Sequence, residues 1–256
     1  MRKLLLLAAC LSALSEAWGW GQKGHDVVAC VAECRLTPEA ATRVADLLDG
    51  YSMVYWANWL DSASHTPEMA YTKTWHYANV DEGFTFETMP KNPAGDVVEA
   101  IERIVAALKS GELSRDEERL HLKMLIHLVG DLHCPMHAGR LSDRGGNSVA
   151  VRFFEEATDL HTLWDTALPE AAHRWSYSEW QNQLDRLPEE TVSEIQAGTP
   201  RRWFEQTQTA CRDIYARTPA GSALSYDYVA HYTPLVERQL LHGGLRLAAL
   251  LNEIYG

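Results

Sequence analysis

Apolar residues recur with the 3.6-residue period of an amphipathic helix through most of this 256-residue chain. The stretch 37–50 opens with Thr37 as a helix cap and Pro38 in the first turn, and 228–255 is a long segment with an apolar stripe. The stretch 95–111 shows the same period at Val97, Ile101, Ile104, Val105 and Leu108. The pattern predicts an all-α fold.

Only residues 147–154, NSVAVRFF, have the alternation of a strand, and they follow two glycines, which favours one half of a short β-hairpin. The polar stretches 79–95 and 172–181 are expected to be surface loops. The sequence contains no internal repeat and no linker that would divide two domains. We therefore expect a single mainly helical domain with a short β-hairpin.

The N-terminus has the order of a secretory signal: Arg2 and Lys3, an apolar run over 4–14, then Ser15 and Ala17. Residues 1–19 are therefore expected to be a signal peptide and 20–256 the mature domain, secreted or periplasmic. Cleavage after Ala17 and cleavage after position 19 both satisfy the small-residue rule. The stretch LAAC at 7–10 is similar to a lipobox, but the apolar segment before it is very short.

No later segment is apolar for long enough to span a bilayer, so we expect no stable membrane association. The mature chain would keep Cys30, Cys34, Cys134 and Cys211, an even number in an oxidising compartment, which predicts disulfide bonding. The pairing cannot be read from the sequence, although one helical turn between Cys30 and Cys34 is a poor geometry for a bond.

The stretch HLVGDLHCPMH, residues 127–137, concentrates residues that bind metals. The run before it reads as a helix with Ser114 as cap, so His127 and Asp131 lie one turn apart on one face. Pro135 must end this helix and would turn His137 back towards that face. The stretch is either ordinary helical core or half of a metal site.

Histidine and aspartate recur elsewhere in patterns that favour the second reading. The stretch 161–165 repeats the i, i+4 spacing, and the further candidate ligands are His25, Asp61, His76, His161 and Asp165. Imidazole with carboxylate suits zinc or another borderline divalent ion. The formal net charge of −12 argues against a protein that grips a polyanion with its own cations. Bound metal would be another source of positive charge.

These residues, taken in order, resemble the zinc-dependent single-strand-specific nuclease and 3′-nucleotidase family, which is related to the bacterial zinc-dependent phospholipases C. The matching motifs are W-G-x-x-G-H at 20–25, W-x-D at 59–61, His76, H-x-x-x-D-x-x-x-x-P-x-H at 127–137, G-G-N at 145–147 and H-x-x-x-D at 161–165. The combination is far more specific than any single motif, and it is similar to that of a bacterial-type member.

The resemblance implies three zinc ions per chain in a cleft of the helical domain. The first would take Asp61, His76, His127 and Asp131, and the second His137, His161 and Asp165. The third would take His25, a bridging Asp131 and the free amine and carbonyl of Trp20. Among the two cleavage sites, the family spacing from Trp20 to His25 favours a mature start at Trp20. His133 is expected to be a bystander.

The implied activity is hydrolysis of single-stranded DNA and RNA to 5′-nucleotides by a zinc-activated water, together with 3′-nucleotidase activity. Asp61 would be the catalytic residue that orients this water or accepts its proton. Tyr77 would stack on a base, although a core aromatic fits it equally well, and Asn147 would contact substrate or serve the turn. Single-stranded nucleic acid and nucleotides are the expected substrates, with no obligatory protein partner.

The chain departs from the family at two substrate positions. Ser64 stands where the eukaryotic enzymes carry a phosphate-binding arginine, and Asn79 stands where a base-recognising aspartate is expected. Substrate preference among DNA, RNA, 3′-nucleotides and phospholipid therefore stays open. The alternatives are a zinc-dependent phospholipase C and a non-catalytic zinc-binding protein. Asp165, where the phospholipases usually have glutamate, and the spacing of the 20–25 motif favour the nuclease.

Overall fold

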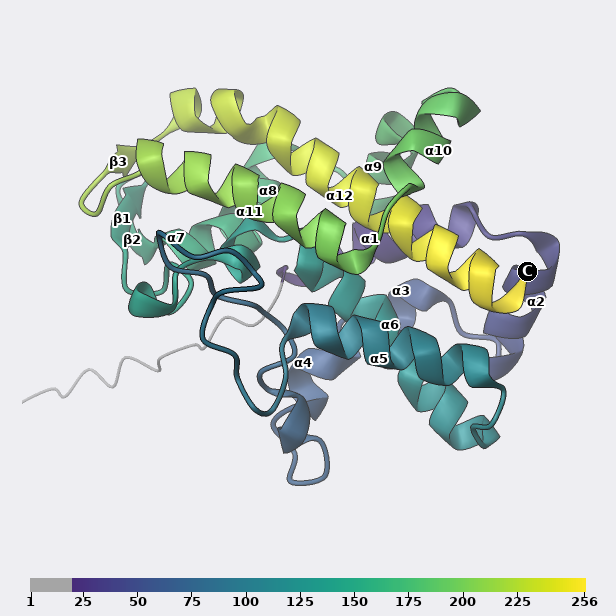
Figure 1. Ribbon diagram of the computed structural model, residues 1–256. Helices are drawn as coiled ribbons and strands as arrows, with labels where there is room; N and C mark the ends of the chain where they lie inside the picture. The colour runs from purple at the N-terminus through teal and green to yellow at the C-terminus, as the bar shows by residue number, and fades with distance from the viewer. Residues whose placement is uncertain (1–19) are drawn as a thin grey trace, which may run out of the picture.

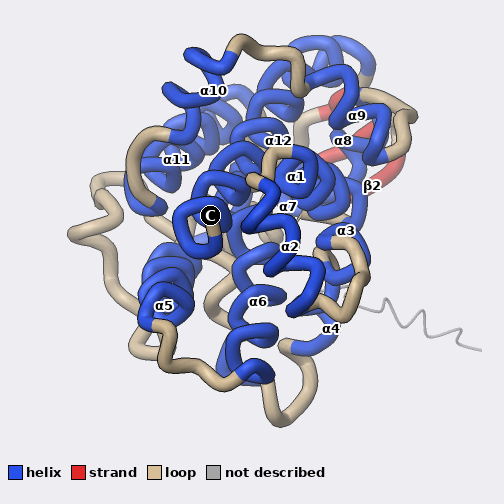
Figure 2. The backbone as a smooth tube through the Cα atoms, turned by 90° about the vertical axis from the view of Figure 1, so that its right-hand side faces the viewer, coloured by secondary structure: helices blue, strands red, loops and turns tan. Residues whose placement is uncertain are grey.

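The computed structural model describes residues 20–256, so the expected signal peptide at 1–19 lies outside the described residues. Helices dominate this part of the chain, as Figure 2 shows, and confirm the predicted helical class. They are α1 (Gln22–Cys34), α2 (Pro38–Leu47), α3 (Met53–Trp56), α4 (Trp59–Ala63), α5 (Val97–Ser110), α6 (Arg115–His133), α7 (Leu160–Thr162), α8 (Leu168–Ala172), α9 (Tyr177–Leu184), α10 (Glu189–Gln196), α11 (Pro200–Arg217) and α12 (Tyr226–Tyr255). Short turns add η1 (Ala70–Thr72), η2 (Pro135–Ala138), η3 (Leu141–Asp143) and the π-helical η4 (Leu163–Ala167).

Helix α6 begins and ends where its sequence predicts. The Ser114 hydroxyl accepts the backbone N–H of Glu117, whose carboxylate accepts the backbone N–H of Ser114 in return. At the other end Cys134 leaves the helical region of backbone space with ψ 120°, as expected for a residue that precedes proline. The chain then forms the short turn η2, so the predicted break at Pro135 is confirmed.

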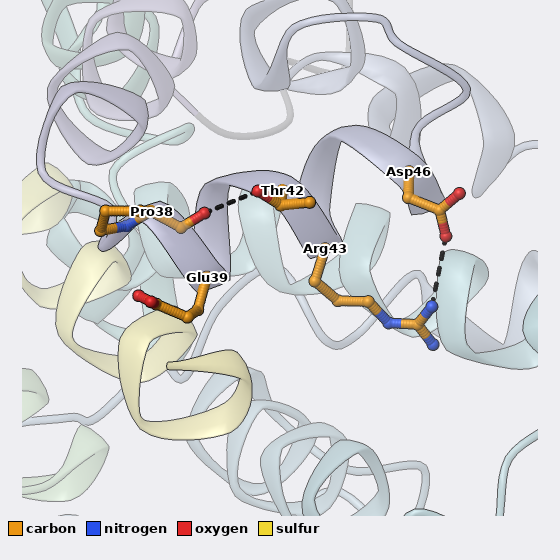
Figure 3. A pocket seen from close by; sticks show the side chains of 5 residues that line it. All are labelled: Pro38, Glu39, Thr42, Arg43 and Asp46. Carbon is orange, nitrogen blue, oxygen red and sulfur yellow. Dashed lines mark hydrogen bonds and ion pairs between the residues drawn. The ribbon is translucent and has the colours of Figure 1, made fainter.

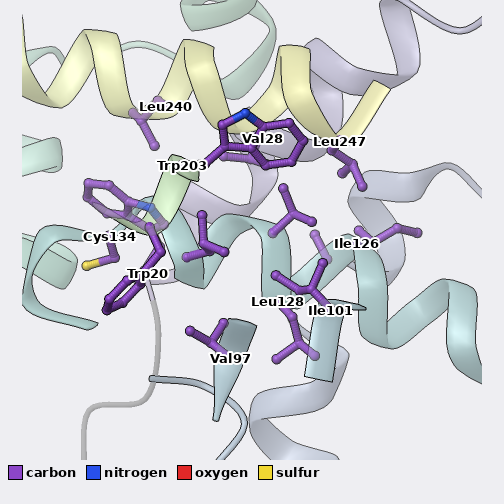
Figure 4. Close-up of a cluster of buried hydrophobic side chains, with 14 of the residues drawn as sticks. Trp20, Val28, Val97, Ile101, Ile126, Leu128, Cys134, Trp203, Leu240 and Leu247 are labelled. Carbon is purple, nitrogen blue, oxygen red and sulfur yellow. The ribbon is translucent and has the colours of Figure 1, made fainter. Parts of the chain in front are cut away.

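The core is organised around the long C-terminal helix α12, which packs against α1 and α6 and runs across the molecule in Figure 1. At its crossing with α1 the backbones come very close, because a Cβ on Gly244 would lie 2.4 Å from the Cβ of Val31. Figure 4 shows part of the buried cluster that results, with Val28, Trp20 and Cys134 among its members. This packing fixes α1 and α6 relative to each other.

The strands form a small sheet at one end of the molecule. β1 (Ala150–Phe153) pairs antiparallel with β2 (Glu156–Asp159), which confirms the predicted hairpin. A third strand, β3 (Ala223–Leu224), pairs in parallel with β1 and gives the order β2-β1-β3. The sheet leads the chain directly from β2 into α7.

One predicted loop is partly wrong. Within residues 172–181 the chain starts α9 at Tyr177, with Ser176 and Glu179 forming a capping box that the sequence already contains. The other expected loop, 79–95, has no regular helix or strand.

The four cysteines of residues 20–256 are unpaired, so the expected disulfide is not formed in the structure. Cys34 is exposed and Cys30 is half-buried one turn before it on α1, whereas Cys134 and Cys211 are buried in different places. Within the same range, every helix is too short or too polar to cross a membrane.

Candidate metal centre and active site

The last two turns of α6 carry the centre of the site. His127 Nε2 lies 3.0 Å from Asp131 Oδ2, as their i, i+4 spacing predicts, and both side chains are fully buried. The His127 ring is held from behind, because its Nδ1 donates to the carbonyl of Ala57 at 2.7 Å. His133 points elsewhere and contacts Arg246 of α12 through Nε2 at 3.0 Å.

The turn after Pro135 brings two distant segments to this face. The backbone N–H of Ala78 donates to the carbonyl of His137 at 2.9 Å, and His137 Nδ1 donates to the carbonyl of His76 at 2.6 Å. His76 Nδ1 is thereby placed 2.9 Å from Asp131 Oδ2 and 3.1 Å from His127 Nε2.

Helix α4 adds Asp61 to the same set. Its Oδ1 lies 3.3 Å from His127 Nε2 and 3.8 Å from His76 Nδ1. The Asp61 side chain is 28% exposed, whereas those of His76, His127 and Asp131 are completely buried. The structure therefore brings together the four residues expected around the first metal, with Asp61 facing solvent.

A second set shares Asp131. The ring of His25, near the start of α1, stacks on His127 with 4.0 Å between centroids, and its Nε2 lies 3.4 Å from Asp131 Oδ1. The two oxygens of Asp131 thus face different histidines, the arrangement of a bridging carboxylate. Trp20 is buried just before α1, and the next backbone N–H, that of Gly21, donates to the carbonyl of Asp165 at 2.7 Å.

The third set lies around the π-helical turn η4. His161 Nε2 is 3.0 Å from Asp165 Oδ2, and the ring of His137 stacks on that of His161 with 5.3 Å between centroids. His137 Nε2 lies 3.7 Å from Asp165 Oδ1. The Cys134 thiol, which sequence reasoning did not include, donates to the same oxygen. The signal for Cys134 in the sequence was its position just before Pro135, within the 127–137 motif.

Three groups of these ligand atoms are compact enough to hold a metal ion. Within each, the atoms lie within 4.8 Å of one another: His25, His127 and Asp131; Asp61, His76 and His127; and Cys134, His137 and Asp165. Several buried polar atoms of these residues and of His161 have no hydrogen-bond partner among residues 20–256, namely both ring nitrogens of His25, Asp61 Oδ1, Asp131 Oδ1, His161 Nε2 and Asp165 Oδ2. Buried polar atoms are seldom left unpaired, so this donor set fits divalent cations.

The electrostatics of the cluster point the same way. Burial, and then the neighbouring His127, lower the pKa of His25. For Asp131, burial acts to raise the pKa, but His127 and His137 together hold it well below its usual range. For His161, burial acts to lower the pKa, but the Asp165 carboxylate raises it to about 9. Ionised carboxylates are therefore buried against imidazoles, where a cation can take the place of protons.

The expected substrate residues lie at the margin of this cluster. Tyr77 and Asn147 are both half-buried, and the Asn147 amide donates to the carbonyl of Arg144 at 2.7 Å, which is the turn contact. Ser64 is fully buried, and its hydroxyl donates to the carbonyl of Asp61 at 3.0 Å. Asn79 lies against the glycine loop, since a Cβ on Gly145 would be 3.0 Å from its Oδ1.

A hollow elsewhere on the surface lacks such chemistry. Figure 3 shows the hollow along α2, where Arg43 pairs with Asp46 at 3.2 Å and the Thr42 hydroxyl donates to the carbonyl of Pro38 at 2.7 Å. Arg43 also pairs with Glu118 of α6, and none of the lining residues belongs to the histidine and aspartate cluster.

The structure defines a mainly helical domain with overlapping, buried groups of histidine and aspartate that could hold metal ions. The chain belongs to the S1/P1 nuclease family, whose sequence profile matches residues 20–256. It is 29% identical to Endonuclease 2 of Arabidopsis thaliana, over 99% of this chain and 96% of that protein. It is 27% identical to Nuclease S1 of Aspergillus oryzae, over 99% and 98%, and 25% identical to Nuclease P1 of Penicillium citrinum, over 93% and 98%.

Proposed function

We propose that the protein is a secreted zinc-dependent nuclease that hydrolyses single-stranded DNA and RNA to 5′-nucleotides and also acts as a 3′-nucleotidase. The observation that carries the proposal is the sharing of Asp131 between two histidine sets, with one oxygen facing His25 and the other facing His127. Membership in the S1/P1 nuclease family supports the reaction class, as do the names of the relatives.

Three zinc ions would be held by the residues that the motifs single out. The first would be held by Asp61, His76, His127 and Asp131; the second by His137, His161 and Asp165; and the third by His25, Asp131 and the backbone of Trp20. When bound, zinc supplies Lewis acidity towards a phosphoryl oxygen and lowers the pKa of a water molecule. The cations would also account for how a chain of net charge −12 accepts a polyanion.

The residues of the chain have separate roles in this reaction. Asp61 is the partly exposed member of its set, so its carboxylate can orient the attacking water and hold the proton that it releases. Ser64 cannot contact the phosphate, because it is buried and bonded to the Asp61 backbone, so phosphate charge is left to the metal centre. Tyr77 would stack on a base, and Asn147, fixed by its turn, would contact the substrate from the glycine loop.

The proposal includes export and a single catalytic domain over 20–256, after a signal peptide at 1–19. The family match that starts at Trp20 supports this boundary. The mature enzyme would be free in the periplasm or the medium, without a membrane anchor or an obligatory protein partner.

The decisive experiment combines metal analysis with four substrates. We expect about three zinc ions per mature chain, following the number of ligand sets. Single-stranded DNA, RNA and 3′-AMP should be hydrolysed, and a phosphatidylcholine analogue should not. Hydrolysis of the lipid alone would assign a phospholipase C, and full metal occupancy without any turnover would assign a binding protein.

A further inference from the structure

The thiol of Cys134 has no role in the proposed reaction. The residue lies between α6 and η2 and is completely buried. Its Sγ lies 3.0 Å from Asp165 Oδ1, within hydrogen-bonding distance, and the thiol is the donor. Two segments 31 residues apart in the sequence are thus joined at one carboxylate oxygen.

The second oxygen of this carboxylate has a different environment. Asp165 Oδ2 forms an ion pair with His161 Nε2 at 3.0 Å, and within residues 20–256 neither of these buried atoms makes a hydrogen bond to any other group. One oxygen of Asp165 is therefore held by Cys134. The other lies beside His161 Nε2, where both atoms are available to bind a metal ion.

The histidines of this set are held in the same way. His137 Nδ1 donates to the carbonyl of His76 at 2.6 Å, and His161 Nδ1 donates to the carbonyl of Gly145 at 2.7 Å. Partners of this kind fix the orientation of a metal ligand, and losing one typically costs about 10–100-fold in metal affinity. His137 and His161 are held by backbone carbonyls, whereas Asp165 is held by the side chain of Cys134.

We propose that Cys134 is a positioning residue of the second metal site, whose thiol holds Asp165 so that Oδ2 faces the metal. The inference rests on the metal assignment of the proposed function. Complete burial explains how a thiol can serve this purpose in an exported protein, because oxidants and other thiols cannot reach it.

The test uses two replacements that differ mainly in hydrogen bonding. Cys134→Ser keeps a donor, and Cys134→Val keeps an apolar side chain without one. Cys211→Ala is the matched control, since Cys211 is also buried but lies on α11. Competition of zinc against a chromophoric chelator gives the affinity of each site, and circular dichroism reports the fold.

We expect Cys134→Val to lower the affinity of one zinc by about 10–100-fold, with Cys134→Ser and Cys211→Ala within a few-fold of wild type. Wild-type affinity in Cys134→Val would overturn the proposal, as would equal losses in Val and Ser. In the cobalt-substituted wild type, a sulfur-to-metal charge-transfer band would overturn it by making Cys134 a direct ligand. A wild type that binds no metal would instead refute the proposed function.

Discussion

Gly130 lies so close to the imidazole of His25 that a methyl group cannot be placed between them: a Cβ on residue 130 would be 2.7 Å from His25 Nδ1. Gly130 belongs to α6 and His25 to α1, so this glycine allows the close approach of the two helices. At this separation His25 Nε2 comes within 3.4 Å of Asp131 Oδ1. A missing side chain thus helps to build the shared carboxylate centre.

Gly130→Ala should therefore displace His25. Overpacking of this kind costs about 1–3 kcal/mol of stability, and we expect loss of the zinc that His25 would hold. Zinc content per folded chain and the Tm measure the two effects. Gly244→Ala is the control, because its Cβ would lie 2.4 Å from the Cβ of Val31, away from the ligands. It should lower the Tm and leave the zinc content unchanged. Full zinc content in Gly130→Ala would contradict the expectation.

Asp61→Asn should reduce kcat by about 10²–10⁴-fold, the range of a general base, because the amide cannot accept the proton of the attacking water. The fold should survive, since the Asp61 side chain is partly exposed and Ser64 bonds to its backbone carbonyl. Steady-state kinetics on single-stranded DNA and a thermal melt separate the two properties. Activity within a few-fold of wild type would remove Asp61 from the reaction.

Local chemistry was sufficient to predict much of this structure. The start of α6 follows from the Ser114 capping box, and its end follows from Pro135, so the facing of His127 and Asp131 was readable from the sequence. His76 is different: its motif position marked it, but its place beside Asp131 depends on the pairing of Ala78 with His137. Such pairings between distant segments produce no periodic pattern in the sequence, so they cannot be predicted from it.

The features that were not predicted from the sequence have two kinds of origin, namely pairing between distant segments and local signals obscured by their surroundings. Strand β3 has two residues and exists because β1 lies beside it, so no alternation could mark it. The amino-acid sequence around Asp165 does not distinguish its π-helical turn from an ordinary α-helix. The Ser176 capping box was a local signal that lay within an expected loop, and aromatic and charged residues around it obscured the short helix α9.

His242 of α12 should make the stability depend on pH. Burial, followed by Arg246 and Arg238, lowers its pKa to about 4, below the ordinary value of 6.5. The unfolded chain therefore binds a proton first, and stability is lost as the pH falls from 6.5 towards 4. His242→Gln removes this term, so its Tm should fall less steeply than that of the wild type over this range. His231→Gln, an exposed position on the same helix, should follow the wild type. Parallel curves for His242→Gln and wild type would exclude the effect.

The first residue of the active enzyme should be Trp20. Trp20 is buried against the start of α1, where a Cβ on Gly24 would lie 2.7 Å from its Cβ, and the adjacent N–H of Gly21 is bonded to Asp165. An α-amine binds zinc only when it is free and deprotonated, so the proposed third site requires a chain that starts at Trp20. We expect protein that begins two residues earlier, at Trp18, to bind about one zinc fewer and to lose most activity. N-terminal sequencing of active secreted enzyme, paired with its zinc content, provides the measurement. Three zinc ions and full activity in a chain that starts at Trp18 would show that the amine of Trp20 is not a ligand.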